Sequence, residues 1–230
     1  LWHWLSPLTK EDFYDKSVLD AGCGNGGNAE ILSQYAKSIT AVDLESTASP
    51  MLHRKTNIQY HQADIENLDF YDKFDISISV GVLHHLNNPK IGFANLVNST
   101  KPGGYVAVWV YSREGNSFMI NVVEPLKTFV LLKLPKPVFQ LVAHISTIIG
   151  YTLAFSPIYL SNFPSLPYCR YFKFWRSYSY ERNYMNVYDK LNAPVTHFIS
   201  REQIEEWGSL LKNPKLKDFN GVSWTLVGTK

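Results

Sequence analysis

The feature that most restricts the fold of this chain is a glycine-rich turn directly after a short apolar run. Ser17-Val18-Leu19-Asp20 predicts a buried strand, and Asp20-Ala21-Gly22-Cys23-Gly24-Asn25-Gly26 predicts the turn. Glycine has no side chain, so the backbone of such a turn can come close to a ligand. Residues 25–36 then predict a helix. Strand, glycine turn and helix in this order predict an α/β sheet with a ligand at its edge.

The following residues continue this alternation of strands and helices. Further strands are expected at residues 38–44, 58–62, 74–80 and 105–111. Helices are expected at residues 46–54, despite Pro50, and at 89–100, with Lys101-Pro102-Gly103-Gly104 as a turn before the last of these strands. Alternation at this spacing predicts a parallel, doubly wound sheet.

Regular patterning stops after Tyr111 and returns near the end of the chain. Six of the 12 prolines lie between Tyr111 and Tyr188. Residues 200–211 predict a helix that begins with a capping box of Ser200 and Gln203. Residues 216–219 and 223–228 predict two last strands. The pattern therefore predicts a sheet-based frame split by a helical insert after the fifth strand.

Charge divides the chain in the same way. Residues 112–188 carry eight Lys and Arg against three acids, a net charge of +5. The rest holds 22 − 8 = 14 basic and 20 − 3 = 17 acidic residues, or −3, within a total of +2. Such a small total does not favour nucleic acid as a partner, but the insert presents a basic surface.

The glycine turn alone does not decide between a dinucleotide and a cofactor with a cationic amino group. Gly22, Gly24 and Gly27 also satisfy the G-x-G-x-x-G spacing of a dinucleotide site. In both cases an acid about 20 residues further on holds ribose hydroxyls, and Asp43 occupies that place. Asp20 would repel a pyrophosphate, whereas it can bind a cationic amino group. Asp20 therefore favours a cationic cofactor.

Asp64 and Ile65 lie just past the third predicted strand. The carboxylate can accept a hydrogen bond from an adenine amino group, and the isoleucine can pack on the ring. No later segment suggests a substrate domain for hydride transfer. These features also favour a cationic cofactor over a dinucleotide.

Taken in order, six segments resemble the successive motifs of class I S-adenosylmethionine-dependent methyltransferases. They are Val18–Gly26, Ala41–Leu44, Ala63-Asp64, Phe74-Asp75, Val82–Leu86 and Lys101–Gly104, and Trp224–Gly228 resembles the last strand of that family. The likeness is greatest to the branch with quinone-biosynthesis and small-molecule enzymes. It covers residues 17–112 and is specific for the cofactor, not for the acceptor.

The resemblance implies a Rossmann-like, seven-stranded sheet whose last strand is antiparallel, with S-adenosylmethionine as cofactor. It implies that Asp20, Gly22, Gly24 and Gly26 surround the methionine part, that Asp43 binds the ribose, and that Asp64 and Ile65 bind the adenine. The expected organisation is a cofactor-binding core at 1–112, a helical acceptor-binding insert at 113–195 and completion of the sheet at 196–230. The two cysteines, Cys23 and Cys169, and the acids and histidines form no metal-ligand spacing, so no metal is expected.

Three histidines are candidates for a general base. His84 and His85 follow the fourth strand at the carboxyl edge of the sheet, and His197 follows the insert. A bracing role by hydrogen bonding is the favoured interpretation for His85, and a surface position for His197. Tyr111 is either a core residue or a wall of the pocket.

Other functions stay open at this stage. An RNA methyltransferase is disfavoured by the modest charge and by the missing Asn/Asp-Pro-Pro-aromatic motif, because the fourth strand runs into Ser79-Val80-Gly81-Val82. Cys23 lies within the glycine turn and does not suit a nucleophile. A non-catalytic module that binds the cofactor for regulation is the second alternative, since methyl transfer requires few particular side chains.

Residues 138–169 contain no Lys, Arg, Asp or Glu, and residues 168–188 interleave aromatic with basic side chains. Polar residues and Pro157 disfavour a membrane span. A lid over the acceptor, or an element that dips into a bilayer, is expected instead. The expected acceptor is a small apolar or anionic molecule, namely a lipid, a quinone precursor or a glycan-linked metabolite. Nucleic acid is not expected, and the expected location is the cytoplasm with peripheral membrane contact. The first residue is Leu1, which is compatible with further residues upstream.

Overall fold

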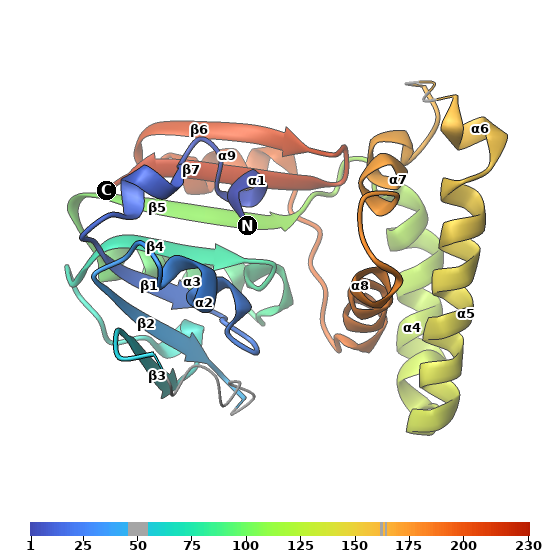
Figure 1. The fold of residues 1–230 in the computed structure, drawn as a ribbon, viewed down its shortest axis with the longest axis horizontal. Helices are drawn as coiled ribbons and strands as arrows, with labels where there is room; N and C mark the ends of the chain where they lie inside the picture. Colours follow the sequence, from blue (N-terminus) through green and yellow to red (C-terminus); the bar gives the residue numbers. More distant parts are fainter. Residues whose placement is uncertain (46–54, 162, 164) are drawn as a thin grey trace. The chain divides into compact units, whose positions relative to one another are not determined.

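The computed structural model describes residues 1–45, 55–161, 163 and 165–230, and the predicted helix at 46–54 lies outside them. The chain forms two compact units (Figure 1). The sheet unit consists of residues 1–111, 199–219 and 224–230, and the helical unit of residues 112–198 and 220–223. The helical unit thus includes residues 196–198 and 220–223, which the sequence assigned to completion of the sheet.

Seven strands form one sheet in the order β3-β2-β1-β4-β5-β7-β6. Their bounds are β1 Ser17–Ala21, β2 Ser38–Asp43, β3 Ile58–Gln62, β4 Phe74–Val80, β5 Thr100–Tyr111, β6 Lys212–Phe219 and β7 Ser223–Thr229. Strands β1 to β5 are parallel. β7 is antiparallel to β5, because the Gly103 amide donates to the Lys230 carbonyl and the Lys230 amide to the Gly104 carbonyl. The predicted fold class is confirmed.

Helices cover both faces of this sheet, because successive side chains of β1, β2 and β4 point to opposite faces and most of them are buried. They are α1 Trp2–Leu5, η1 Lys10–Phe13, α2 Gly27–Leu32, η3 Ile65–Asn67, η4 Leu83–His85, α3 Pro89–Ser99 and α9 Arg201–Gly208. In β1, Leu19 packs toward the face with α3 and α9, whereas Val18 packs toward the face with α1, η1 and α2.

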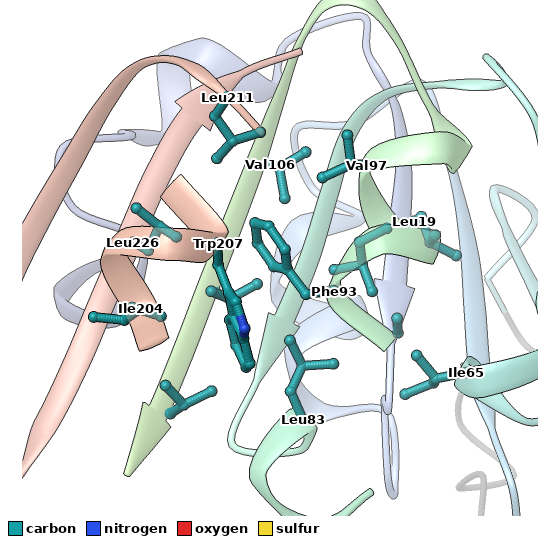
Figure 2. Packing of buried hydrophobic residues seen from close by; sticks show 14 of the residues in the cluster. Leu19, Ile65, Leu83, Phe93, Val97, Val106, Ile204, Trp207, Leu211 and Leu226 are labelled. Carbon is teal, nitrogen blue, oxygen red and sulfur yellow. The ribbon is translucent and has the colours of Figure 1, made fainter. Parts of the chain in front are cut away.

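The larger core lies on the α3 and α9 side (Figure 2). Phe93 of α3 stacks on Trp207 of α9, with ring centroids 5.1 Å apart and an interplanar angle of 17°. Nineteen buried apolar side chains belong to this cluster among the described residues. This cluster holds α3 and α9 on one face of the sheet. The ligand site is expected at the ends of the strands.

The helical unit has seven short or long helical segments in its described part. They are η5 Met119–Val123, α4 Glu124–Phe129, η6 Leu131–Lys133, α5 Lys136–Ala154, α6 Pro157–Leu160, α7 Cys169–Trp175 and α8 Tyr180–Asn192. α5 packs against α7 and α8. Two clusters with three buried apolar residues each hold these helices together.

A charged side chain is buried in this unit. Lys127 of α4 is fully buried, and its Nζ lies 2.6 Å from Oε2 of Glu124. The same Nζ donates a 2.9 Å hydrogen bond to Oγ1 of Thr196. A buried ammonium is tolerated when it is paired and hydrogen-bonded in this way.

Several predicted elements differ from the structure. β6 begins at Lys212 and not at residue 216, and α9 ends at Gly208 and not at residue 211. The predicted turn at residues 101–104 is wrong, because these residues belong to β5. Gly103 adopts a positive φ of 79°, and the β4–β5 register shifts between Phe74 and Ile76, so a local irregularity absorbs the turn-forming residues. α2 ends at Leu32, short of the predicted Ala36, and the Asn57 side chain donates to the carbonyls of Ser33 and Ala36 beyond its end. The capping box at α9 is confirmed.

Candidate cofactor site

The carboxyl ends of the five parallel strands meet at one edge of the sheet, where open α/β sheets bind ligands. β1 leads there into Gly22, and β2 ends at Asp43. β4 leads into Val82 and η4, and β5 ends at Tyr111. The predicted residues of the sheet unit are therefore brought to the same edge from strands that are distant in sequence.

The glycine turn is anchored at one point and open at another. The amides of Gly22 and Cys23 donate to the Val42 carbonyl, at 2.7 and 3.0 Å. Gly22 has a φ of 83°, and a Cβ atom built there would lie 2.4 Å from a methyl group of Val82. At Gly24, with a φ of 53°, a built Cβ would find no atom within 4 Å. The turn is thus locked against β2 and Val82 at Gly22, while Gly24 borders open space.

Asp43 is bound to this turn. Its Oδ2 accepts a 2.7 Å hydrogen bond from the Gly24 amide, and its Oδ1 accepts one of 3.1 Å from the Glu45 amide. Each carboxylate oxygen can accept more than one hydrogen bond. Asp43 therefore holds the turn in place and can still accept from ligand hydroxyls.

Asp20 is the most unusual group of the site. Its side chain is fully buried, and neither carboxylate oxygen has a hydrogen-bond partner in the described protein. Burial first, and the nearby Asp43 carboxylate second, raise the pKa of Asp20 to about 7. A buried carboxylate without a partner is costly unless a donor or a cation completes it. Asp20 thus points to a ligand with such a group.

Asp64 and Ile65 have structural contacts of their own. Asp64 caps η3, since its Oδ1 accepts from the Glu66 amide and its Oδ2 from Nδ2 of Asn67, both at 2.9 Å. Ile65 is buried within the core next to α3. Their predicted contacts with adenine stay predictions.

The histidines lie in different units. His84 is fully buried, with its ring centroid 4.0 Å from that of Tyr111 and 4.2 Å from that of His85. His85 is partly exposed. His197 belongs to the helical unit, where its Nε2 is buried without a hydrogen-bond partner in the described part of the chain. The structure thus brings together His84, His85 and Tyr111.

Two residues of this edge escaped the sequence reasoning. Val82 closes on Gly22, and its place just before Leu83 and the histidine pair was the only available signal. Glu66 accepts hydrogen bonds from the Asn87 and Asn88 amides, at 3.2 and 2.7 Å. It ties η3 to the loop after the histidines, and no local pattern marked it in advance.

Comparison with known proteins agrees with this geometry. Residues 19–108 match the family described as a methyltransferase domain. The ubiquinone biosynthesis O-methyltransferases of Rickettsia conorii and Rickettsia bellii (strain OSU 85-389) are 27% and 28% identical to this chain over 117 residues. Each match covers 49% of this chain, with 40% and 49% of the relative, so the chain spans at most about half the length of these relatives.

A solved structure is similar over nearly the whole chain. It is described as a possible exported protein from Bordetella parapertussis, and it has a TM-score of 0.53 at 15% identity. The alignment covers 99% of this chain and 66% of the other. At this identity the likeness concerns the fold, and it includes the residues of the helical unit.

The sheet and its ligand-binding edge define a Rossmann-like, cofactor-binding domain. Over residues 19–108, which are less than half of the chain, this domain is similar to class I S-adenosylmethionine-dependent methyltransferases. S-adenosylmethionine is the cofactor of this class, and the residues present fit it. The unpartnered Asp20 suits an ammonium group, and the open space at Gly24 beside Asp43 suits a close approach to the backbone.

Proposed function

We propose that the protein transfers a methyl group from S-adenosylmethionine to a small acceptor that is apolar, amphipathic or anionic, such as a lipid or a quinone precursor. The observation that carries the proposal is Asp20, a buried carboxylate without a partner beneath a glycine turn that Asp43 holds in place. A cationic amino acid moiety with a ribose attached satisfies both acids.

When bound, S-adenosylmethionine would supply an electrophilic methyl group on its sulfonium for transfer to a nucleophilic atom of the acceptor. In this proposal Asp20 binds the ammonium, Asp43 the ribose hydroxyls, and Asp64 with Ile65 the adenine. Gly22, Gly24 and Gly26 allow the backbone to lie against the methionine part. These residues align the reacting atoms, and alignment in a dry site provides most of the rate enhancement that such a reaction needs.

A hydroxyl acceptor also requires a base for its proton. His85 is partly exposed and His84 is fully buried against Tyr111, which favours His85 as the base and His84 as its support. His197, the other histidine that the sequence indicates, belongs to the helical unit and is tested in parallel. Replacement of His85 by Gln should lower kcat at least about 100-fold and leave the affinity for S-adenosylhomocysteine unchanged if His85 is the base, whereas the same loss in His197→Gln would assign the base to His197.

Titration calorimetry with S-adenosylhomocysteine tests the cofactor site. The wild type should bind, and Asp43→Ala should bind at least about 100-fold more weakly, because it removes charge-assisted hydrogen bonds to the ligand and the brace on Gly24. Asp69→Ala, which removes an exposed acid of the same unit, is the matched control. An unchanged affinity in Asp43→Ala, or binding of NADH in place of S-adenosylhomocysteine, would refute the site.

Turnover with a labelled methyl donor tests the acceptor class. Label should pass to lipid-like or quinone-precursor acceptors and not to RNA. Labelled RNA would instead support an RNA methyltransferase. Cofactor binding without turnover on any acceptor class would support a regulatory module.

A further inference from the structure

Exposed apolar side chains are concentrated on the long helix of the helical unit. One face of α5 is buried against its neighbours through residues spaced three and four apart, namely Phe139, Ala143, Thr147, Gly150 and Ala154. The opposite face carries Leu141, Ile145, Ile148 and Ile149, which are 48–58% exposed. A helix on the surface of a water-soluble protein normally turns polar residues outward. α5 is apolar on both sides.

A second apolar stripe precedes α5 in the same unit. Phe118, Val122, Leu126 and Phe129 follow one another at spacings of four, four and three residues along η5 and α4. All four are exposed, and Phe129 is 70% exposed. Val123 of the same segment packs against the buried cluster that contains Phe139 of α5, so the stripe and the exposed face of α5 belong to one packed group of helices. An apolar surface of this extent marks an interaction site.

Topology excludes a simple membrane crossing by α5. It is the one described helix that is long and apolar enough to span a bilayer, and 22% of its most apolar window is buried. The chain leaves the sheet after β5 and returns to the same sheet with β7 and β6. A single crossing would place these neighbouring strands on opposite sides of the membrane. Any contact of α5 with a bilayer is therefore made from one side only.

The charges of this segment identify the kind of surface it meets. Between residues 125 and 180 the sequence holds six Lys and Arg and no Asp or Glu. Lys133 at the end of η6 and Lys136 at the start of α5 are exposed and make no ion pair with any described residue. Basic side chains beside an apolar helix face attract anionic headgroups, while their aliphatic stems follow the apolar surface.

We propose that the helical unit binds the surface of an anionic lipid bilayer, with the exposed face of α5 at the acyl boundary and Lys133 and Lys136 on the headgroups. This inference goes beyond the proposed function, because cofactor binding by the sheet unit requires no membrane. It also gives a route by which a lipid-like acceptor reaches the enzyme. A second copy of the chain is the weaker alternative, since two faces with the same positive charge would repel each other.

Vesicle sedimentation with the full chain tests the proposal. Wild type should bind vesicles of phosphatidylcholine with 30% phosphatidylglycerol, about tenfold more weakly without phosphatidylglycerol, and more weakly as salt rises. Leu141→Asp with Ile148→Asp should weaken binding at least about 30-fold, because charge at the acyl boundary is costly. Lys133→Gln with Lys136→Gln should weaken it about tenfold and reduce its salt dependence.

Leu210→Asp is the matched control, because Leu210 is an equally exposed leucine of the sheet unit, and it should bind vesicles like the wild type. Each variant should keep wild-type affinity for S-adenosylhomocysteine, which shows that it folds and separates this test from that of the proposed function. No vesicle binding by the wild type, or an equal loss in Leu210→Asp, would overturn the proposal. A dimer in light scattering that only Leu141→Asp with Ile148→Asp dissociates, without vesicle binding, would assign the face to a second copy.

Discussion

The sheet unit and the helical unit bury their apolar residues in opposite ways. In the sheet unit, clusters of nineteen and fifteen buried apolar side chains fill the two faces of the sheet among the described residues. In the helical unit, two clusters of three buried residues coexist with long exposed apolar stripes. The sheet unit satisfies its apolar surface internally. The helical unit leaves much of its own for something else to cover, which is typical of a surface that binds.

Buried charges differ between the units in the same sense. Lys127 of the helical unit is completed by Glu124 and Thr196, whereas Asp20 of the sheet unit has no partner. The sheet unit therefore buries its apolar side chains but leaves the charge of Asp20 without a partner. The helical unit pairs the charge of Lys127 but leaves apolar surface exposed. We propose that the unpaired charge and the exposed apolar surface each bind a ligand of matching chemistry.

Truncation of one phenylalanine in each unit tests this comparison. Phe93→Ala removes a fully buried ring stacked on Trp207 and should lower the free energy of unfolding of the sheet unit by about 3–5 kcal/mol. Phe129→Ala removes an exposed ring from the helical unit and should change the free energy of unfolding of that unit by less than about 0.5 kcal/mol. Urea denaturation, with hydrogen exchange to assign each unit, measures both. Similar losses would mean that the stripe on α4 is covered within the chain.

The paired lysine gives the next largest effect. Lys127→Met leaves the partly buried Glu124 without its cation and should destabilise the helical unit by about 3 kcal/mol, visible as faster exchange of amides in α4 and α8. Lys127→Met with Glu124→Gln removes both charges and should recover most of that loss. If the double variant is as unstable as the single one, the pair contributes through packing and not through charge.

Asp20 gives the smallest of these effects, as a pH dependence of binding. With its pKa near 7, the carboxylate is mostly protonated at pH 6 and mostly ionised at pH 8. If ammonium binding requires the ionised form, the affinity for S-adenosylhomocysteine should rise by about tenfold between these two pH values. Asp20→Asn should flatten the profile in calorimetry. A tenfold rise that persists in Asp20→Asn would assign the titration to another group.

The raised pKa of Asp20 also predicts the direction in which the stability of the folded protein changes with pH. The folded protein holds a proton on Asp20 between pH 3.8 and about 7 that the unfolded chain has released, so the contribution of Asp20 to stability falls as pH rises through this window. Asp20→Asn should therefore raise the melting temperature of the unliganded protein at pH 8 more than at pH 5. Differential scanning calorimetry at the two pH values checks this.

Much of the sheet unit could be predicted, because its signals are local. β3 and β4 have the predicted bounds, and the capping box of Ser200 fixes the start of α9. Residues 101–104 were misjudged because pairing with β7, which is distant in sequence, overrides the turn-forming tendency of Pro102 and Gly103. Local patterns cannot report a partner strand so far along the chain.

For the cofactor site, the sequence identified which residues gather at the edge but not their state. The order of Asp20, Asp43 and Asp64 was enough to choose S-adenosylmethionine over a dinucleotide. It did not show that Asp20 is without a partner, or that Val82 closes on Gly22, since both depend on packing between separate strands. Nor did it show the two faces of α5, because a run without charge looks the same whether it is covered or not.

The place of the helical unit in the chain has a further consequence for the exchange of such segments between proteins. Residues 112–198 form one long connection between β5 and α9, and the family match ends at residue 108, just before it. Loop-closure entropy grows only with the logarithm of length, so this connection costs about 2 kcal/mol more than a ten-residue linker. A chain can therefore gain, lose or replace such a segment without loss of its sheet. Acceptor preference and attachment to a surface can change in this way while the cofactor edge stays the same.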